Sequence, residues 1–259
     1  MIGADRDDGK RVLPRKFAAA DAEAFYSVLT TTAGFNQDNM LLLTNRSERK
    51  PTLRNIKWAL GTFLGRSAKP DDMVIVYFAG LGGVEVDPRG AERDRLAKYF
   101  LPSDATADDL YQTALPLSDF QAIFERIEAE RVILFLDSHY SGAAGGRTFA
   151  SKKSRRTTDD PLLERLSRSR GRVIMTASKP NELALEDPSF GHGIFTYYLM
   201  EGLRGAADLN RDGIVSLQEL YEYVEQHASR KSRTIGGNQH PVMKGEQEGV
   251  LPLVRVPRP

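Results

Sequence analysis

The fold is decided by residues 73–83, which read MVIVYFAGLGG. The first part of this stretch, 73–78, is apolar, β-branched or aromatic without a break, which is typical of a strand buried on both faces of a sheet. A second run of this kind, 132–136, ends at Asp137, and residues 173–175 supply a third. These runs predict the centre of a mostly parallel sheet.

Helical patterns alternate with these runs. Apolar residues recur at intervals of three and four within residues 15–32 and 53–64. Ser118-Asp119-Phe120-Gln121 has the form of a capping box, and it predicts a helix that runs to about Glu130. Strands that alternate with helices indicate an α/β fold with helices on both faces of the sheet. We expect function at the carboxyl ends of its strands.

The composition of the chain excludes several classes of protein and of site. The 36 basic and 35 acidic residues leave a formal net charge of +1, which gives no field that would attract nucleic acid or an anionic membrane. No apolar run approaches the length of about 20 residues that a membrane helix needs, and residues 1–8 lack the apolar core of a signal peptide. We therefore expect a cytoplasmic protein without a nucleic-acid or membrane partner. Because the chain has no cysteine, disulfides, thiolate metal sites and a cysteine nucleophile are excluded.

Residues 77–83 and 136–142 resemble two strand ends of the caspase and metacaspase peptidases, including the bacterial branch. Active members carry Tyr-Phe-Ser-Gly-His-Gly at the first, where the histidine is the general base. They carry Asp-Ser-Cys-His-Ser-Gly, or a close variant, at the second, where the cysteine is the nucleophile. Here these two positions are Leu81 and His139. The resemblance covers nearly the whole chain, because Ala20-Asp21-Ala22 and residues 195–205 also look like the family.

The resemblance implies a caspase-like three-layer sandwich that forms a single domain over residues 1–259. It divides the chain into a large-subunit-like part (1–143), a basic connecting loop (144–171) and a small-subunit-like part (172–259). In active relatives this loop is where self-cleavage occurs. Here it is interpreted as a solvated loop, with cutting by another protease or docking of an acidic partner as alternatives.

The resemblance also bears on the start of the sheet. The family's first strand normally precedes an Ile-Gly pair like Ile2-Gly3, and this chain begins at the end of that strand. We therefore expect the sheet to lack a central strand.

Whether the chain can act as a peptidase depends on these two replaced positions. A cysteine protease needs a thiolate and a base, and leucine can neither accept nor donate a proton. We therefore expect a catalytically inactive pseudo-protease that binds a peptide or protein partner through the former substrate cleft. One alternative is a residual or altered hydrolase that acts on Lys or Arg peptides, with His139 beside Ser138 or Ser141. Another is a plain interaction module of a larger system.

Two residues near the second replaced position have alternative roles. His139 is interpreted as a loop histidine bonded to the backbone, or as a metal ligand with Asp137 or His192. Asp137 is interpreted as a capping or turn residue. Carried over from metacaspase-like members, it would instead be a substrate-binding residue in a pocket for a basic side chain of the partner.

Residues 208–219 read DLNRDGIVSLQE and fit the EF-hand pattern. The metal ligands expected at positions one, three, five, seven, nine and twelve are Asp208, Asn210, Asp212, the Ile214 carbonyl, Ser216 and Glu219. An all-oxygen set favours Ca²⁺ over zinc or copper. The helices on either side are expected at 192–204 and 217–230. The alternative is a solvated Asp-Gly turn that caps the following helix, and because only one loop is present, a bound ion would be structural.

Overall fold

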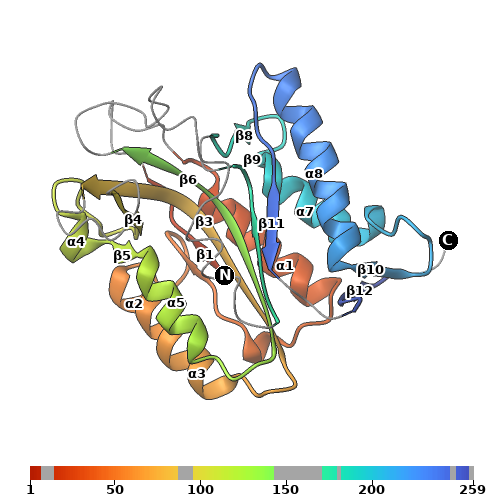
Figure 1. Cartoon of the computed structure of the whole chain (residues 1–259), viewed down its shortest axis with the longest axis horizontal. Coiled ribbons are helices and arrows are strands. Elements are labelled where there is room, and N and C mark those ends of the chain that lie inside the picture. Colours follow the sequence, from red (N-terminus) through yellow and green to blue (C-terminus); the bar gives the residue numbers. More distant parts are fainter. Residues whose placement is uncertain (7–14, 87–95, 143–170, 180–181, 246–248, 257–259) are drawn as a thin grey trace.

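The computed structural model describes residues 1–6, 15–86, 96–142, 171–179, 182–245 and 249–256. A central sheet lies between two layers of helices, as Figure 1 shows, which confirms the predicted α/β sandwich. Along the sheet the strand order is β11-β7-β6-β3-β1-β2. These strands are β1 (Ile2–Gly3), β2 (Leu43–Thr44), β3 (Met73–Val86), β6 (Arg131–Gly142), β7 (Arg172–Thr176) and β11 (Val242–Gly245). All neighbours in this order are parallel except β11, which is antiparallel to β7.

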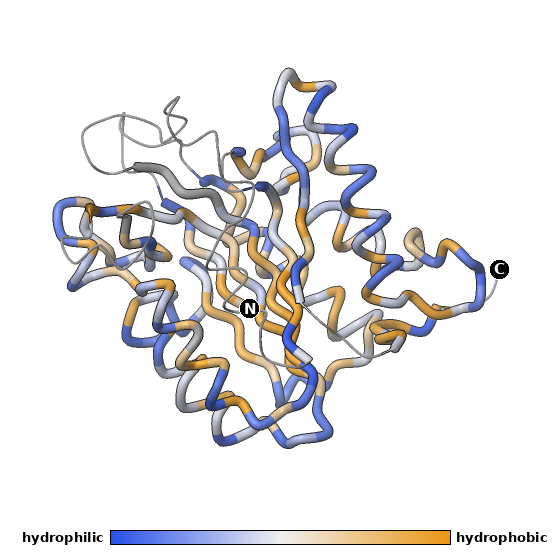
Figure 2. The backbone as a smooth tube through the Cα atoms, viewed as in Figure 1, coloured by the Kyte–Doolittle hydropathy of each residue, from blue (hydrophilic) through white to orange (hydrophobic). Residues whose placement is uncertain are grey.

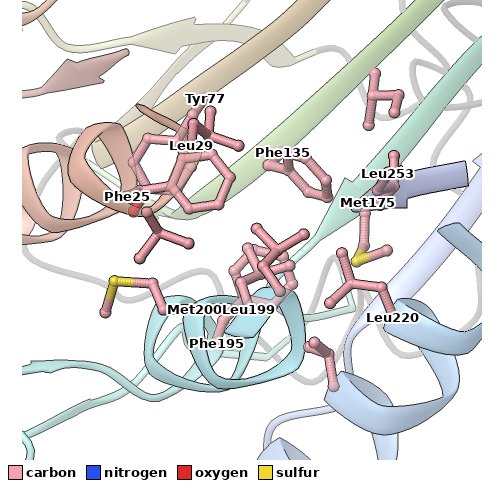
Figure 3. Close-up of a cluster of buried hydrophobic side chains, with 14 of the residues drawn as sticks. Phe25, Leu29, Tyr77, Phe135, Met175, Phe195, Leu199, Met200, Leu220 and Leu253 are labelled. Atoms are coloured by element: carbon pink, nitrogen blue, oxygen red, sulfur yellow. The ribbon is translucent and has the colours of Figure 1, made fainter. Parts of the chain in front are cut away.

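Each face of the sheet has its own helices and its own core. Tyr77 and Phe135 point to the face covered by α1, α7 and α8, as Figure 3 shows, whereas Val76 and Leu134 point to the face covered by α2 and α5. This alternation follows from the two-residue period of a strand. Figure 2 shows hydrophobic residues gathered on the central strands. The helices are α1 (Ala18–Thr31), α2 (Leu53–Lys57), η3 (Trp58–Phe63), α3 (Leu64–Ser67), α4 (Leu110–Thr113), α5 (Leu117–Glu125), α7 (Ile194–Glu201), η4 (Gly202–Ala206) and α8 (Leu217–Thr234), with a short η2 (Gln37–Asn39).

The two longest strands continue past the apolar runs that predicted them. β3 and β6 stay paired from Met73 and Arg131 to Val84 and Gly142. β3 also pairs in antiparallel fashion with β4 (Leu96–Phe100), which in turn pairs with β5 (Leu115–Pro116). Backbone hydrogen bonds sustain these extensions where the apolar pattern stops. The segments interpreted as strand ends therefore lie inside strands.

Helix boundaries differ from those expected. α1 begins at Ala18 instead of residue 15, and α5 ends at Glu125 instead of Glu130. The capping box predicted at Ser118 is wrong, because α5 begins one residue earlier, at Leu117, and its N-cap is Pro116, which forms no side-chain capping bond.

The start of the sheet also differs from the expectation. β1 is present and lies inside the sheet, between β2 and β3, so the predicted loss of this strand is wrong. It pairs with both neighbours through Ile2 and Gly3 alone. A Cβ on Gly3 would lie 2.2 Å from the Ala18 carbonyl oxygen, so glycine lets α1 pack closely on this strand. An apolar cavity of about 470 Å³ beside β1 is lined by Met1, Leu41 and the first residues of β3.

No helix in the described ranges combines the length and the hydropathy needed to cross a bilayer. The cytoplasmic location stays a prediction.

Candidate functional site

The two positions that the resemblance assigns to the catalytic dyad are neighbours in the sheet. Leu81 on β3 is the register partner of His139 on β6. Leu81 is fully buried in an apolar cluster that includes Tyr99, Leu101 and Leu110. Its carbonyl accepts the Leu101 N–H at 2.9 Å, which holds the chain after β4 against β3. Position 81 is therefore part of a packed core.

The side chain of His139 lies outside the part of the chain that the structure describes, as does that of Ser141. The proposed metal site with Asp137 or His192 and the residual hydrolase therefore stay predictions. The basic connecting loop also lies outside the described residues, apart from Gly171.

Asp137 lies on β6, two residues before His139, and its side chain is completely buried. Its Oδ1 forms an ion pair with Arg15 Nη2 at 2.8 Å, and its Oδ2 accepts the Thr196 hydroxyl at 2.6 Å. The Tyr77 hydroxyl lies 2.6 Å from the same Thr196 oxygen. Since threonine has one hydroxyl proton and gives it to Asp137, Tyr77 donates to Thr196. Both carboxylate oxygens of Asp137 thus have partners within the chain.

Arg15 supplies the cation of this network, and 2% of it is exposed. Nη2 also donates to the Asp137 backbone oxygen at 3.1 Å, and Nη1 donates to the Ala184 oxygen at 3.1 Å. Nε lies 3.4 Å from Glu186 Oε1, which makes a second ion pair. Burial disfavours the charged guanidinium, but the nearby carboxylates outweigh burial and raise the pKa of Arg15.

Glu186, on β8 (Glu186–Asp187), also fixes the start of α1. It accepts the backbone N–H groups of Lys16 at 3.1 Å and Phe17 at 3.0 Å. These bonds satisfy two donors just before the helix and place the Glu186 charge where the helix dipole favours an anion.

A second buried carboxylate, Asp21 on α1, lies beside Asp137. His192 Nδ1 is 2.7 Å from Asp21 Oδ1, and the Gly193 N–H points at both Asp21 oxygens. These two residues form β9, which pairs with β8. Burial raises the pKa of Asp21 to about 6, with a further increase from the Asp137 charge, although His192 opposes the shift. A Cβ on Gly193 would lie 2.5 Å from Asp137 Oδ2, so glycine allows the backbone to pass between the two acids.

Sequence reasoning identified Asp137 but missed Arg15 and Thr196, which bond to it, and Glu186, which forms an ion pair with Arg15. Asp21 entered through the resemblance alone. A signal for it was present, because Asp21 shares the buried helical face of Ala18 and Phe25 at intervals of three and four residues. A charged residue on such a face requires buried partners.

The predicted calcium loop lies between η4 and α8. The backbone turns through left-handed conformations at Arg211 (φ 60°) and Gly213 (φ 84°). Asp208 accepts the N–H groups of Asp212 at 3.1 Å and Gly213 at 3.0 Å. Glu219 accepts the Asn210 N–H at 3.3 Å. The acidic side chains thus turn toward the inside of the loop.

The same loop makes a helix cap and a strand. Ser216 and Glu219 form a capping box at the start of α8, as the alternative interpretation expected. Strand β10 (Ile214–Ser216) pairs in antiparallel fashion with β12 (Pro252–Arg255), near the C-terminal end. The loop is therefore joined by backbone pairing to a strand from elsewhere in the chain.

Within the described ranges, no group of three or more His, Asp or Glu side chains has a spacing that would hold a metal ion. Glu219 bonds to Ser216, whose amide and hydroxyl lie 3.0 and 2.7 Å from Oε2. The calcium site stays a prediction.

Comparison with known proteins agrees with this architecture. The metacaspase, peptidase C14 domain, matches residues 16–145, which is half of the chain. Metacaspase-1 of Yarrowia lipolytica is 34% identical over 87 residues, which make up 32% of this chain and 19% of that protein. Metacaspase-1 of Saccharomyces cerevisiae is 29% identical over 102 residues, which are 38% of this chain and 22% of that protein. The matched region is thus about a fifth of the length of these curated relatives.

Two solved structures have a similar fold. Protein GSU0716 from Geobacter sulfurreducens superposes with a TM-score of 0.64 at 16% identity, over 99% of this chain and 97% of that one. Caspase-1 from Spodoptera frugiperda superposes with a TM-score of 0.57 at 15% identity, over 98% of this chain and 88% of that one. The likeness covers nearly the whole chain, on both sides of the connecting loop.

Proposed function

Since this chain belongs to the metacaspase peptidase C14 family, we propose that it is a pseudo-protease, a member that keeps the fold and has lost the peptidase chemistry. The observation that carries the proposal is Leu81, which fills the position of the general base and is buried among apolar side chains. Leucine cannot accept a proton, and its full burial in this cluster keeps position 81 away from water.

The second half of the dyad supports the same proposal. The chain has no cysteine, so no thiolate exists at position 139 or at any other. The register places His139 directly opposite Leu81, so a hydroxyl nucleophile there would have no base on the neighbouring strand. The acids nearby, Asp137 and Asp21, are already bonded to Arg15, Thr196 and His192.

We also propose that the pseudo-protease binds Ca²⁺ through residues 208–219. The donor set is entirely oxygen, and three carboxylates would neutralise a divalent cation. Asp208 and Asp212 already face into the loop, where they accept backbone N–H groups. Glu219 already accepts the Asn210 N–H across the loop with Oε1, and its Oε2 would have to give up its bonds to Ser216 to make the carboxylate a bidentate ligand. The ion would supply positive charge between β10 and α8 and so fasten the β10–β12 pair to the helix.

The function that remains is binding of a peptide or protein at the carboxyl edge of the sheet. Open α/β sheets bind ligands at this edge. Three acidic side chains, Asp21, Asp137 and Glu186, lie near it, with Arg15 among them. The pseudo-protease would act by holding its partner without cleaving it.

The test is a peptidase assay with Ca²⁺ present, using fluorogenic Lys and Arg peptides and an arginyl electrophile that labels active metacaspases. An active metacaspase serves as the positive control. We expect no turnover above buffer and no labelling of the wild type. Turnover that disappears in His139→Ala would overturn the proposal and establish the altered hydrolase instead.

A further inference from the structure

The side chain of Arg15 occupies the region that, in the family, recognises a side chain of the substrate. Its guanidinium donates to three acceptors, the Asp137 carboxylate and the backbone oxygens of Asp137 and Ala184, while its Nε lies 3.4 Å from the Glu186 carboxylate without a hydrogen bond. The Arg15 and Asp137 side chains are 1% and 0% exposed, so this contact excludes water. The arrangement is that of a bound ligand, with the ligand supplied by residue 15.

The shape of this pocket favours a guanidinium over an ammonium. A planar fork with donors on separate nitrogens reaches acceptors on several sides at once, whereas a lysine ammonium concentrates its donors at one point. Here Nη1 and Nη2 reach Ala184 and Asp137, and Nε faces Glu186. A lysine could satisfy some of these acceptors but not all of them.

The charges of the surrounding carboxylates also favour a cation at this place. Without Arg15, the fully buried Asp137 carboxylate would lose its counter-ion, with Asp21 and the Glu186 carboxylate, whose side chain is 14% exposed, close by. Removing one partner of a buried ion pair leaves the other charge uncompensated. A cation is therefore required in this pocket, and Arg15 meets that requirement without a ligand from solution.

We propose that Arg15 is a specificity-determining residue of the former substrate cleft, an internal occupant that closes its acidic pocket to the basic side chains of a partner. The inference rests on the proposed binding function, because it concerns which ligands that cleft accepts. An arginine attached to the same chain acts at a high effective concentration, so a free ligand competes poorly with it. The wild-type protein therefore recognises its partner through groups other than Asp137.

The experiment is a chemical rescue of Arg15→Ala. Thermal unfolding is followed for the wild type, Arg15→Ala and the control Arg46→Ala, which removes the exposed Arg46–Glu23 pair. Each is measured with agmatine, which carries a guanidinium and an ammonium, and with putrescine, which carries two ammonium groups on the same four-carbon chain. We expect Arg15→Ala to unfold at a lower temperature and to recover at least half of the loss with agmatine, but not with putrescine. The wild type and Arg46→Ala should not respond to either.

Two results would overturn the inference: a Tm of Arg15→Ala equal to that of the wild type, or a response to agmatine equal in both. If Arg15→Ala does not fold, Arg15→Met, which keeps the apolar stem, is titrated with methylguanidinium, and absence of a shift counts against the inference. The readout is stability, so it is independent of peptidase turnover. An active enzyme with a rescuable Arg15→Ala would overturn the pseudo-protease and leave the internal occupant standing.

Discussion

Leu81 and His139 face each other as register partners on adjacent parallel strands, within an unbroken ladder from Met73 and Arg131 to Val84 and Gly142. Backbone hydrogen bonds build this ladder, so the two positions stay adjacent whichever side chains they carry. The pairing of these strands therefore does not depend on a catalytic dyad, and Leu81 contributes to the apolar cluster beneath α4.

Leu81→His, which introduces the residue that active members of the family carry here, should lower the free energy of unfolding by about 2–4 kcal/mol, because it places a polar imidazole in a fully buried and mostly apolar site. Urea unfolding measures the change. Val86→His, near the end of the same strand, where the side chain is 68% exposed, is the matched control and should change stability by less than about 0.5 kcal/mol. Equal effects at the two positions would mean that Leu81 is not tightly packed.

Gly193→Ala should cost about 1–3 kcal/mol, because its Cβ would push against the carboxylates of Asp137 and Asp21 at 2.5 and 3.0 Å. The matched control is Gly65→Ala on α3, where an added Cβ meets nothing within 4 Å. That change should stabilise the protein by about 0.5–1 kcal/mol, through helix propensity. Thermal or urea unfolding of both variants provides the comparison. A stable Gly193→Ala protein would contradict the close approach between the two acids.

The strands and the layers could be predicted from the sequence because each depends on local patterns. Continuous apolar runs located β3, β6 and β7, and the three-to-four spacing of apolar residues located α1. The extension of β3 past Phe78 could not be predicted in this way, because antiparallel pairing with β4 sustains it. The capping box at Ser118 failed for a similar reason, since pairing of Pro116 with Tyr99 sets where α5 begins.

The candidate site was harder to predict because its contacts are distant in sequence. Arg15 and Asp137 are 122 residues apart, and Thr196 lies 59 residues beyond Asp137. Composition cannot reveal that the counter-ion of the buried Asp137 is a residue far away in the sequence. The pairing of β10 with β12 is likewise a tertiary contact. Residue type and spacing located Asp137, and the fold determined what binds to it.

Asp21 should make stability depend on pH. Its pKa is raised from 3.8 to about 6 in the folded protein, chiefly by burial. Between these values the folded state keeps a proton that the unfolded chain has released. The stability from this group is therefore complete below pH 3.8 and is lost as the pH rises through about 6.

The measurement is the difference in unfolding free energy between the wild type and Asp21→Asn from pH 4 to pH 7.5. The wild type should lose up to about 3 kcal/mol relative to the variant across this range. The Met1 amine, whose pKa burial lowers from 8.0 to about 5, makes stability rise with pH, but it contributes equally to both proteins and cancels. Asp38→Asn, on the surface, should leave the pH profile unchanged. A flat difference for Asp21→Asn would contradict the raised pKa.

Calcium should stabilise the wild type, and this stabilisation should depend on Glu219. A ligand that binds the folded state alone at 100 times its Kd adds about 2.7 kcal/mol, which thermal unfolding with Ca²⁺ and with a chelator would detect. Glu219→Gln should abolish the response. Glu222→Gln, one turn further along α8 and exposed, should preserve it. Because glutamine can also fill the N3 position of the capping box, the variant should lose only the favourable charge at the helix start, about 0.3–1 kcal/mol, when calcium is absent.

The location of the calcium effect gives a second, independent readout. If the ion fastens the β10–β12 pair, amide hydrogen exchange at Val215 and Val254, which are register partners, should slow when Ca²⁺ is added. Amides of Val76 and Leu134 in the central sheet should change little, because β10 and β12 form a separate two-stranded sheet that is not paired with the central one. A calorimetric titration that stays flat in the wild type would remove the calcium site. Slowing spread evenly over the whole chain would instead mean that the ion stabilises the domain without acting on β12.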